Sequence, residues 1–444
     1  MEKELLNCRE AALGLLEFIS ESPSPFHAAA SIEKRLRQAG FVLLPEYERW
    51  NLERGGKYYV MRGGSSIAAF LIPETEEEIR GFQMICSHTD SPAFKIKESF
   101  ELKGDPYYRK LNVEKYGGMI CSSWFDRPLS VAGRVMVFQE GRIVSKLVHI
   151  DRDLLMIPNL AIHMNREIND GFRYQIQQDL CPVLGEAGEK GGFLELLAEA
   201  AQVPEEEILG TDLYLYNRQK GTFWGQEQEF IASPRLDDLQ CVYGSLMGFL
   251  KAVPGRHVPV FCAFNNEETG SLSRQGAAST FLQDLLKRIS RSLGGDEEDY
   301  IRRVANSFML SADNAHAVHP NHPEKADPVN RPVMNGGIVI KYQAEQKYTT
   351  DARGGAVVKL LCRKAGVPWQ VYTNHSNQPG GSTLGNLSNM QVSQSSADIG
   401  LAQLAMHSAY EMAGAEDVYH LQRLAEVFYN TDLNTEEDES VILA

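Results

Sequence analysis

The sequence lacks the cysteine patterns that mark disulfide scaffolds and thiolate zinc sites. Its 444 residues contain seven cysteines, an odd number, and no two of them form a C-x-x-C pair. A scattered, odd set excludes a paired disulfide framework. Cys86 and Cys262 lie inside apolar runs, where a free thiol behaves as a small hydrophobic side chain. These features predict a protein of the reducing cytoplasm.

The sequence also lacks long apolar runs and basic clusters. No run reaches the roughly 18 apolar residues of a membrane span, so we expect none. The first 20 residues mix charges with apolar positions and do not resemble a signal peptide. The formal net charge is −15. Without a basic surface that attracts a phosphate backbone, nucleic-acid binding is not expected.

The hydrophobic pattern divides the chain into three segments. Residues 1–90 and 234–444 alternate helical periodicity with short apolar runs, which indicates βαβ units and a mostly parallel sheet flanked by helices. One of the helices predicted there spans 271–293. Residues 91–233 alternate apolar and polar positions between glycine turns, the pattern of antiparallel strands. We therefore predict a discontinuous α/β domain with a β-rich domain inserted between its halves.

Polar residues follow several predicted strands of the α/β segments. Ligands in such folds gather at the carboxyl ends of the strands, so these side chains are candidates for one site. They are His88 and Asp90 after "FQMICS", Glu267 and Glu268 after "VPVFCAFN", Asp313 after "NSFMLSA", Asp237 before a predicted helix, and His407 near the C-terminus. Two imidazoles with several carboxylates and no thiolate are typical of a hydrolytic pair of metal ions. Such a pair needs a bridging carboxylate and a base, so adjacent glutamates are explained if one binds metal and the other takes a proton.

Each of these residues also has a simpler explanation. A histidine beside a strand is usually buried and hydrogen-bonded, and a pair of glutamates usually lies on the surface. Asp237 and Asp238 are suitable N-cap residues for the helix that follows. His316, His319 and His322 in "NAHAVHPNH" form either a metal-binding tract or a polar loop. Only the common position of the candidates at strand ends favours a single site.

Six sequence blocks resemble, in order, the M18 metallopeptidases, the aspartyl aminopeptidase family. They are "SHTDSP", "SPRLDDL", "NNEETGS", "SADNAHAVHPNH", "GGST" and "MHSAYEM". "SPSPFHA", "WFDRPLSVAGRV" and "IPNLAIHMNRE" resemble the same family, so the likeness covers essentially the whole chain. The resemblance implies a zinc-peptidase-like α/β catalytic domain, an inserted dimerisation domain, and a hydrolase that removes N-terminal residues, preferably Asp or Glu, from peptides.

The resemblance also implies a role for each candidate residue. Two divalent ions, zinc first and manganese or cobalt as alternatives, would be bound by His88, Asp237, Glu268, Asp313 and His407. Asp237 would bridge the ions, with a cis peptide to Asp238, and Asp90 would orient His88. Glu267 would be the general base for a shared water. Substrate contacts would fall to Lys341, which would bind the acidic side chain, and to His163, His316, Gly381 and Ser382.

The resemblance further implies self-association. In the family, a histidine at the position of His163 reaches into the site of a partner subunit, which requires at least a dimer, and the usual assembly is a dodecamer. Residues 121–123 depart from the family pattern next to an expected interface. Other hypotheses remain open at this point: an aminopeptidase that prefers neutral residues, a deacylase on the same scaffold, and a non-catalytic assembly protein.

Overall fold

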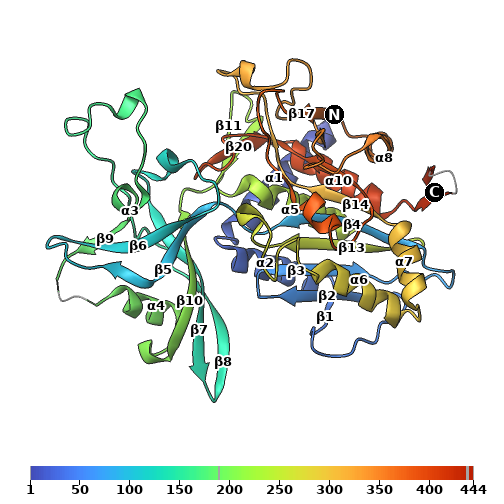
Figure 1. Ribbon diagram of the computed structural model, residues 1–444, viewed down its shortest axis with the longest axis horizontal. Helices are drawn as coiled ribbons and strands as arrows, with labels where there is room; N and C mark the ends of the chain where they lie inside the picture. Colours follow the sequence, from blue (N-terminus) through green and yellow to red (C-terminus); the bar gives the residue numbers. More distant parts are fainter. Residues whose placement is uncertain (1, 189–190, 437–439, 444) are drawn as a thin grey trace.

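The computed structural model describes residues 2–188, 191–436 and 440–443. A nine-stranded sheet with its helices forms the right-hand part of Figure 1, and a six-stranded sheet forms the left-hand part. None of the described helices is both long and apolar enough to cross a membrane. All seven cysteines are free thiols.

The nine-stranded sheet confirms the predicted α/β class. Its central strands β13, β4, β14 and β18 pair in parallel. Strand β4 is buried along its whole length, as its continuous apolar sequence predicts. In spatial order the strands are β1 (Val42–Leu43), β2 (Lys57–Arg62), β3 (Ser66–Leu71), β13 (His257–Phe264), β4 (Gly81–His88), β14 (Phe308–Ala312), β18 (Ser395–Gly400), β16 (Ile338–Tyr342) and β17 (Trp369–Thr373).

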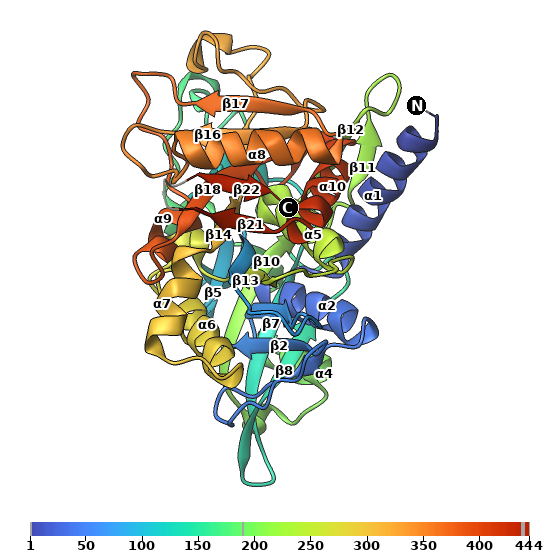
Figure 2. The same ribbon diagram turned by 90° about the vertical axis from the view of Figure 1, so that its right-hand side faces the viewer.

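Helices cover both faces of this sheet because its strands carry apolar side chains on both sides. On β13, Phe261 and Ala263 belong to one apolar core, whereas Val260 and Cys262 belong to another. The first core contains residues of α1 (Glu2–Ser20), α2 (Pro25–Gln38), α5 (Leu236–Phe249), α8 (Ala352–Ala365) and α10 (Asp417–Tyr429). The second contains residues of α6 (Phe281–Ser292), α7 (Glu297–Ala305) and α9 (Leu384–Asn389). Figure 2 shows α8 lying across β16 and β18.

The helix predicted over 271–293 is shorter than expected, because α6 begins only at Phe281. Ser271 has a positive φ of 59°. The side chains of Ser273 and Gln275 both donate to Oδ1 of Asn266. These bonds hold the segment before α6 in turns against the loop that follows β13. Local hydrogen bonding by polar side chains therefore competes with the helix.

The strand pairs of the six-stranded sheet are antiparallel, as the alternating pattern predicts. In spatial order the strands are β8 (Arg142–His149), β7 (Leu129–Gln139), β10 (Ile208–Asn217), β5 (Ala93–Leu102), β6 (Tyr108–Tyr116) and β9 (Val183–Glu186). Together with α4 (Phe193–Ala201) and the short α3 (Ile176–Asp179), this sheet encloses its own apolar core.

A five-stranded sheet links distant parts of the chain. Its strands in spatial order are β11 (Thr222–Trp224), β12 (Phe230–Ser233), β20 (Glu411–Gly414), β19 (Ala402–Leu404) and β15 (Ala315–His316). Strands β21 (Leu433–Thr435) and β22 (Val441–Leu443) form a separate antiparallel pair. Strands β11 and β12 fall within the predicted insertion; β11 pairs with β12, and β12 pairs with β20. The domain boundaries at 90 and 233 stay a prediction.

Candidate metal centre

Three neighbouring strands end at the same edge of the nine-stranded sheet, and each ends in or is followed by an imidazole or a carboxylate. Strands β13, β4 and β14 lie side by side and run parallel, so their carboxyl ends meet. His88 is the last residue of β4, and Asp313 follows β14 directly. Glu267 and Glu268 begin the 3-10 helix η4 (Glu267–Thr269) shortly after β13. The structure thus brings together residues that are far apart in the sequence.

Two overlapping groups of ligand-type atoms form at this edge. In the first, Nε2 of His88 lies 3.6 Å from Oδ1 of Asp237 and 3.9 Å from Oδ1 of Asp313. In the second, Nε2 of His407 lies 3.5 Å from Oδ2 of Asp237 and 3.4 Å from Oε2 of Glu268. The two oxygens of Asp237 therefore face different groups. A carboxylate shared in this way is what a pair of metal ions requires.

The hydrogen bonds of the two imidazoles leave Nε2 of each ring available as a ligand. Nδ1 of His407 lies 2.6 Å from the carbonyl oxygen of Gly118, and Nδ1 of His88 lies 3.1 Å from that of Asp90. A carbonyl oxygen can only accept, so Nδ1 carries the proton in both rings. In its neutral form, each ring would present its lone pair at Nε2, which faces the carboxylates.

Hydrogen bonds of Asp90 and Tyr116 hold the segment that carries Glu267 and Glu268 in place. The buried Asp90 carboxylate accepts the backbone N–H groups of Glu267 and Glu268. Its Oδ2 also accepts the hydroxyl of Tyr116 at 2.7 Å. The Tyr116 oxygen in turn accepts an N–H from the side chain of Asn266, at 2.8 Å. Since Tyr116 belongs to β6, the six-stranded sheet contributes directly to the geometry of this edge.

Asp237 and Asp238 point in different directions from the start of α5. The peptide bond between them is cis. The backbone N–H of Asp237 donates to Oε2 of Glu411 at 3.0 Å, and that of His407 donates to Oε1 of the same side chain at 2.7 Å. Asp238 is fully buried, and its Oδ2 accepts the backbone N–H of His88 at 3.2 Å. One of the pair is thus a ligand candidate, and the other holds a ligand candidate in place.

The carboxylates of this edge are buried with too few hydrogen bonds. Oδ1 of Asp237, Oδ1 of Asp238 and Oε1 of Glu268 have no hydrogen-bond partner among the described residues. Burial raises the pKa of Glu267 to about 8 and lifts the pKa values of Glu268 and Asp238 well above their usual range. Buried oxygens without partners cost free energy unless a cation lies beside them. The residues present therefore fit divalent metal ions with nitrogen and oxygen ligands.

Comparison with known proteins decides the family. The profile of the family described as Aminopeptidase I zinc metalloprotease (M18) matches residues 18–429. A probable M18 family aminopeptidase 2 of Clostridium novyi (strain NT) is 45% identical over 422 residues, which cover 94% of this chain and 98% of that protein. The chain belongs to the M18 family. It is a metallo-aminopeptidase.

Solved structures share the fold of this M18 chain. A chain of the cryo-EM structure of the Ape4 and Nbr1 complex matches with a TM-score of 0.92 and 35% identity, covering 95% of this chain and 86% of that one. A chain of the S. cerevisiae mApe1 dodecamer matches with a TM-score of 0.83 and 28% identity, covering 95% of this chain and 96% of that one.

A cavity of about 130 Å³ opens over the ligand candidates of the M18 chain. It is lined by four residues predicted to bind substrate, namely Lys341, His316, Gly381 and Ser382. His163, the fifth, does not line this cavity. It is exposed in the loop between β8 and η2 (Ile168–Asp170), which extends away from the nine-stranded sheet at the upper left of Figure 1.

Lys341 is a buried cation in the wall of this cavity. Its Nζ donates to the carbonyl oxygens of Asp313 and Asn314 at 2.7 and 3.1 Å, and lies 3.6 Å from Oδ2 of Asp313. Burial alone would lower the pKa of Lys341, but the Asp313 carboxylate raises it above its usual range. An ammonium group has three N–H donors. Two are used within the protein, so one remains for a ligand.

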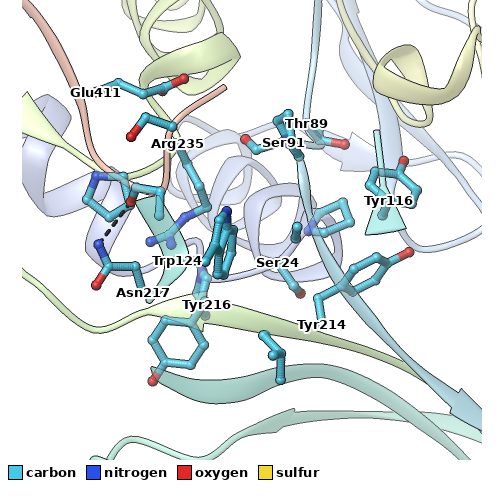
Figure 3. Close-up of a pocket in the computed structure, with 18 residues that line it drawn as sticks. Ser24, Thr89, Ser91, Tyr116, Trp124, Tyr214, Tyr216, Asn217, Arg235 and Glu411 are labelled. Atoms are coloured by element: carbon cyan, nitrogen blue, oxygen red, sulfur yellow. Dashed lines mark hydrogen bonds between the residues drawn. The ribbon is translucent and has the colours of Figure 1, made fainter. Parts of the chain in front are cut away.

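A smaller cavity of about 30 Å³ is lined by residues of the six-stranded sheet and of the loops that follow β4 and His407 (Figure 3). Thr89, Ser91 and Glu411 form the part of its wall nearest the metal centre. Asn217, at the end of β10, donates a side-chain N–H to the carbonyl oxygen of Ala409 at 2.9 Å, the dashed bond of Figure 3. The loop that carries His407 therefore rests on the six-stranded sheet of this M18 aminopeptidase.

Sequence reasoning missed Tyr116, Glu411 and Tyr348, which shape the centre, and it gave Asp238 only as an N-cap candidate and as the partner of Asp237 in a cis peptide. Asp238, Tyr116 and Glu411 hold ligand candidates in place, and the ring of Tyr348 lies 5.3 Å from Nζ of Lys341. Asp238 and Glu411 belong to the same sequence blocks as predicted ligands, so their proximity to those ligands in the sequence could have identified them as supporting residues. Tyr116 offered no such signal, because it stands 26 residues from Asp90 in a segment with the pattern of an ordinary strand.

Proposed function

We propose that the chain is a two-metal aminopeptidase that removes N-terminal Asp or Glu residues from peptides. The observation that carries this proposal is the Asp237 carboxylate, whose two oxygens face Nε2 of His88 and Nε2 of His407. His88 and Asp313 would hold one ion, Glu268 and His407 the other, and Asp237 both. When bound, such ions polarise a carbonyl group and lower the pKa of a water molecule. Zinc is the first candidate, and the nitrogen and oxygen ligand set also suits manganese or cobalt.

Glu267 is the proposed general base. Its Oε2 lies 4.0 Å from Nε2 of His88, so the carboxylate stands beside the ligand groups. Its side chain lines the cavity and keeps 15% of its surface exposed. Because Asp90 holds its backbone, Glu267 is positioned to take the proton of the attacking water and deliver it to the leaving amine.

Lys341 is the proposed selector of the N-terminal residue. Its remaining N–H donor can form a charge-assisted hydrogen bond with an acidic side chain in the cavity. Gly381 and Ser382 line the same cavity and are proposed to contact the substrate backbone, with His316 as a further substrate contact.

The environment of Lys341 also supports a second candidate, an aminopeptidase that prefers neutral residues. Two donors of the lysine already bind carbonyl groups, and the Asp313 carboxylate lies nearby. Its charge is therefore partly compensated before a substrate enters. Substrate preference separates the two candidates.

Hydrolysis of Asp-, Glu- and Leu-p-nitroanilide tests the proposal. The protein is stripped with a chelator, and kcat/KM is measured after addition of Zn²⁺, Mn²⁺ or Co²⁺. The proposal expects metal-dependent cleavage with Asp and Glu above Leu. Metal-dependent cleavage that favours Leu would overturn the specificity and keep the metal centre. Absence of cleavage with every metal would favour a deacylase or a non-catalytic assembly protein.

We also infer that the chain self-associates and that His163 acts in the site of a second copy. The loop of His163 is anchored at its base, where Asp126 accepts the backbone and side-chain N–H groups of Asn159 at 2.9 and 2.7 Å. Its uncovered apolar side chains are Leu160, Ile162 and Met164, which are 55%, 48% and 69% exposed. Similarity to a chain of a dodecameric structure supports the inference.

A further inference from the structure

A larger groove opens directly beside the catalytic cavity. It has a volume of about 520 Å³ and shares His316, Tyr372, Gly381 and Met406 with the smaller cavity. This volume is within the range of ligand-binding sites. An aminopeptidase holds one residue on the amino side of the scissile bond, so the rest of the peptide must leave the small cavity. The shared wall makes this groove a continuous path for it.

The groove is lined by one lysine, four histidines and otherwise neutral side chains. Its basic and imidazole side chains are His316, His319, His322, Lys325 and His375. Among the described residues that line it, none is Asp or Glu. The chain as a whole has 59 acidic and 44 basic residues, so this lining departs from the average surface. Within the described part of the chain, Lys325 makes no ion pair.

Two of the imidazoles offer an unused N–H donor. The backbone N–H of Asn321 donates to Nδ1 of His319, and that of Asn377 donates to Nδ1 of His375, both at 3.2 Å. Since Nδ1 accepts in each ring, the proton of the neutral ring lies on Nε2. Neither Nε2 has a hydrogen-bond partner among the described residues. A carboxylate is the acceptor that such donors bind most strongly.

The carboxylates on the neighbouring loop lie beside the groove, and one of them already faces a side chain that lines it. Oδ1 of Asp327 accepts the backbone N–H groups of Val329 and Asn330. Oε1 of Glu324 lies 3.2 Å from Nδ1 of His322. Neither carboxylate lines the groove. The pairing of Glu324 with His322 shows that one of these imidazoles already binds a carboxylate.

We propose that this groove binds the part of the peptide that follows the scissile bond and favours acidic side chains there. The proposal rests on the aminopeptidase function proposed above and extends its specificity beyond the N-terminal residue. Lys325 and the Nε2–H groups of His319 and His375 bind the carboxylates of the following residues. The preferred substrate is thus a peptide with acidic side chains both at its N-terminal residue and at positions after the scissile bond.

Three tetrapeptide amides with the same first two residues test the groove. Asp-Ala-Glu-Glu, Asp-Ala-Gln-Gln and Asp-Ala-Lys-Lys differ only in the part that the groove would hold. We expect kcat/KM for the Glu peptide to exceed that for the Gln peptide by about 3- to 10-fold at low salt, and the Lys peptide to be the poorest. Raising the salt concentration should reduce the difference, because the groove is open to solvent.

Variants of the groove residues show whether Lys325, His319 and His375 cause the preference for the Glu peptide. The triple variant Lys325→Ala, His319→Ala, His375→Ala should bring the Glu-to-Gln ratio close to one, whereas Lys325→Arg alone should keep most of it. Lys103→Ala, which removes an exposed lysine in the turn between β5 and β6, is the charge-matched control and should leave the ratio unchanged. Binding of the same peptides to the Glu267→Gln variant, measured by calorimetry, should follow the same order without turnover.

The possible outcomes separate this proposal from the proposed function. Equal kcat/KM for the three tetrapeptides, alongside cleavage of Asp-p-nitroanilide, would overturn the groove assignment alone. A Glu preference that survives in the triple variant would do the same. If neither the tetrapeptides nor Asp-p-nitroanilide is cleaved with any metal, the aminopeptidase function fails and the groove proposal fails with it.

Discussion

The carboxylate of Asp90 holds Glu267 by its backbone N–H group, with an N···Oδ1 distance of 3.2 Å. The other oxygen of Asp90 accepts the backbone N–H of Glu268, also at 3.2 Å, and its carbonyl oxygen accepts Nδ1–H of His88. One buried residue therefore sets the positions of the proposed base and of two proposed ligands. Because the glutamates are held by their backbones, their side chains remain free for chemistry.

The substitution Glu267→Gln should keep the metal ions and lose turnover. It removes the proposed base and leaves the ligand set intact, so kcat for Asp-p-nitroanilide should fall by about 100- to 10,000-fold. Metal content measured by mass spectrometry should stay at the wild-type level. The matched substitution Glu268→Gln changes a proposed ligand and should lower both. Wild-type kcat in Glu267→Gln would remove this residue from the mechanism.

The substitution Asp90→Asn should weaken metal binding. Loss of the anionic acceptor loosens both glutamate backbones, and residues that orient ligands typically contribute about 10- to 100-fold to metal affinity. Competition with a chromogenic chelator measures this affinity. Tyr116→Phe removes only the hydroxyl that donates to Asp90 and should produce a smaller loss. Equal affinity in wild type and Asp90→Asn would mean that the ligands are fixed by other contacts.

The substitution Lys341→Met should reduce cleavage of Asp substrates more than that of Leu substrates. A hydrogen bond to a charged group contributes about 1.5–3 kcal/mol, so the Asp-to-Leu ratio of kcat/KM should fall by about 10-fold or more. The Leu substrate is the internal control for damage to the Asp313 side of the centre. A parallel loss on both substrates would contradict a role for Lys341 in reading the side chain.

Mixing two inactive variants should restore activity if His163 acts in a second copy of the chain. Each of the substitutions His163→Ala and Glu267→Gln should disable every site when it is present alone. In mixed pairs, one site has an intact Glu267 and receives an intact His163, so random pairing of equal amounts should recover about a quarter of wild-type activity. Co-expression followed by assay of the assembled protein measures this. Absence of recovery would place His163 in its own chain's site or outside catalysis.

Protonation of His27 should destabilise the fold at mildly acidic pH. Burial, together with the nearby positive groups of His149 and Arg235, lowers the pKa of His27 to about 4. The unfolded chain has the ordinary value of about 6.5, so this stabilisation is fully present above pH 6.5 and is lost as the pH falls toward 4. Urea unfolding in the presence of a chelator should show wild type losing at most about 2 kcal/mol more than His27→Gln between pH 7 and pH 5. Equal losses in the two proteins would show that His27 does not titrate this way.

Strand-end positions were sufficient to nominate His88, Glu267 and Asp313 from the sequence, because a parallel sheet aligns its carboxyl ends. The antiparallel strands of the six-stranded sheet could be predicted because apolar and polar residues alternate along residues 91–233. The five-stranded sheet could not be predicted, since β15 and β19 have only two and three residues and show no period. The acceptor of the His407 ring, the carbonyl of Gly118, also escapes sequence reasoning, because a backbone carbonyl has no residue signature.

The backbone of Gly117 lies close against Glu268 of the metal centre. Gly117 has a φ of +78°, and a Cβ atom there would lie 3.1 Å from Cβ of Glu268. The next residue, Gly118, accepts the His407 ring, and the backbone N–H of Ile120 donates to the His407 carbonyl at 2.9 Å. Residues 91–233, the predicted insertion, therefore contact the metal centre directly, even though the proposed metal ligands all lie outside this segment. Shortening the chain to residues 1–90 and 234–444 would preserve every proposed ligand and still remove the wall against which two of them are set. We expect a proteolytic cut between β6 and η1 (Cys121–Trp124) to release the metal ions before the nine-stranded sheet unfolds.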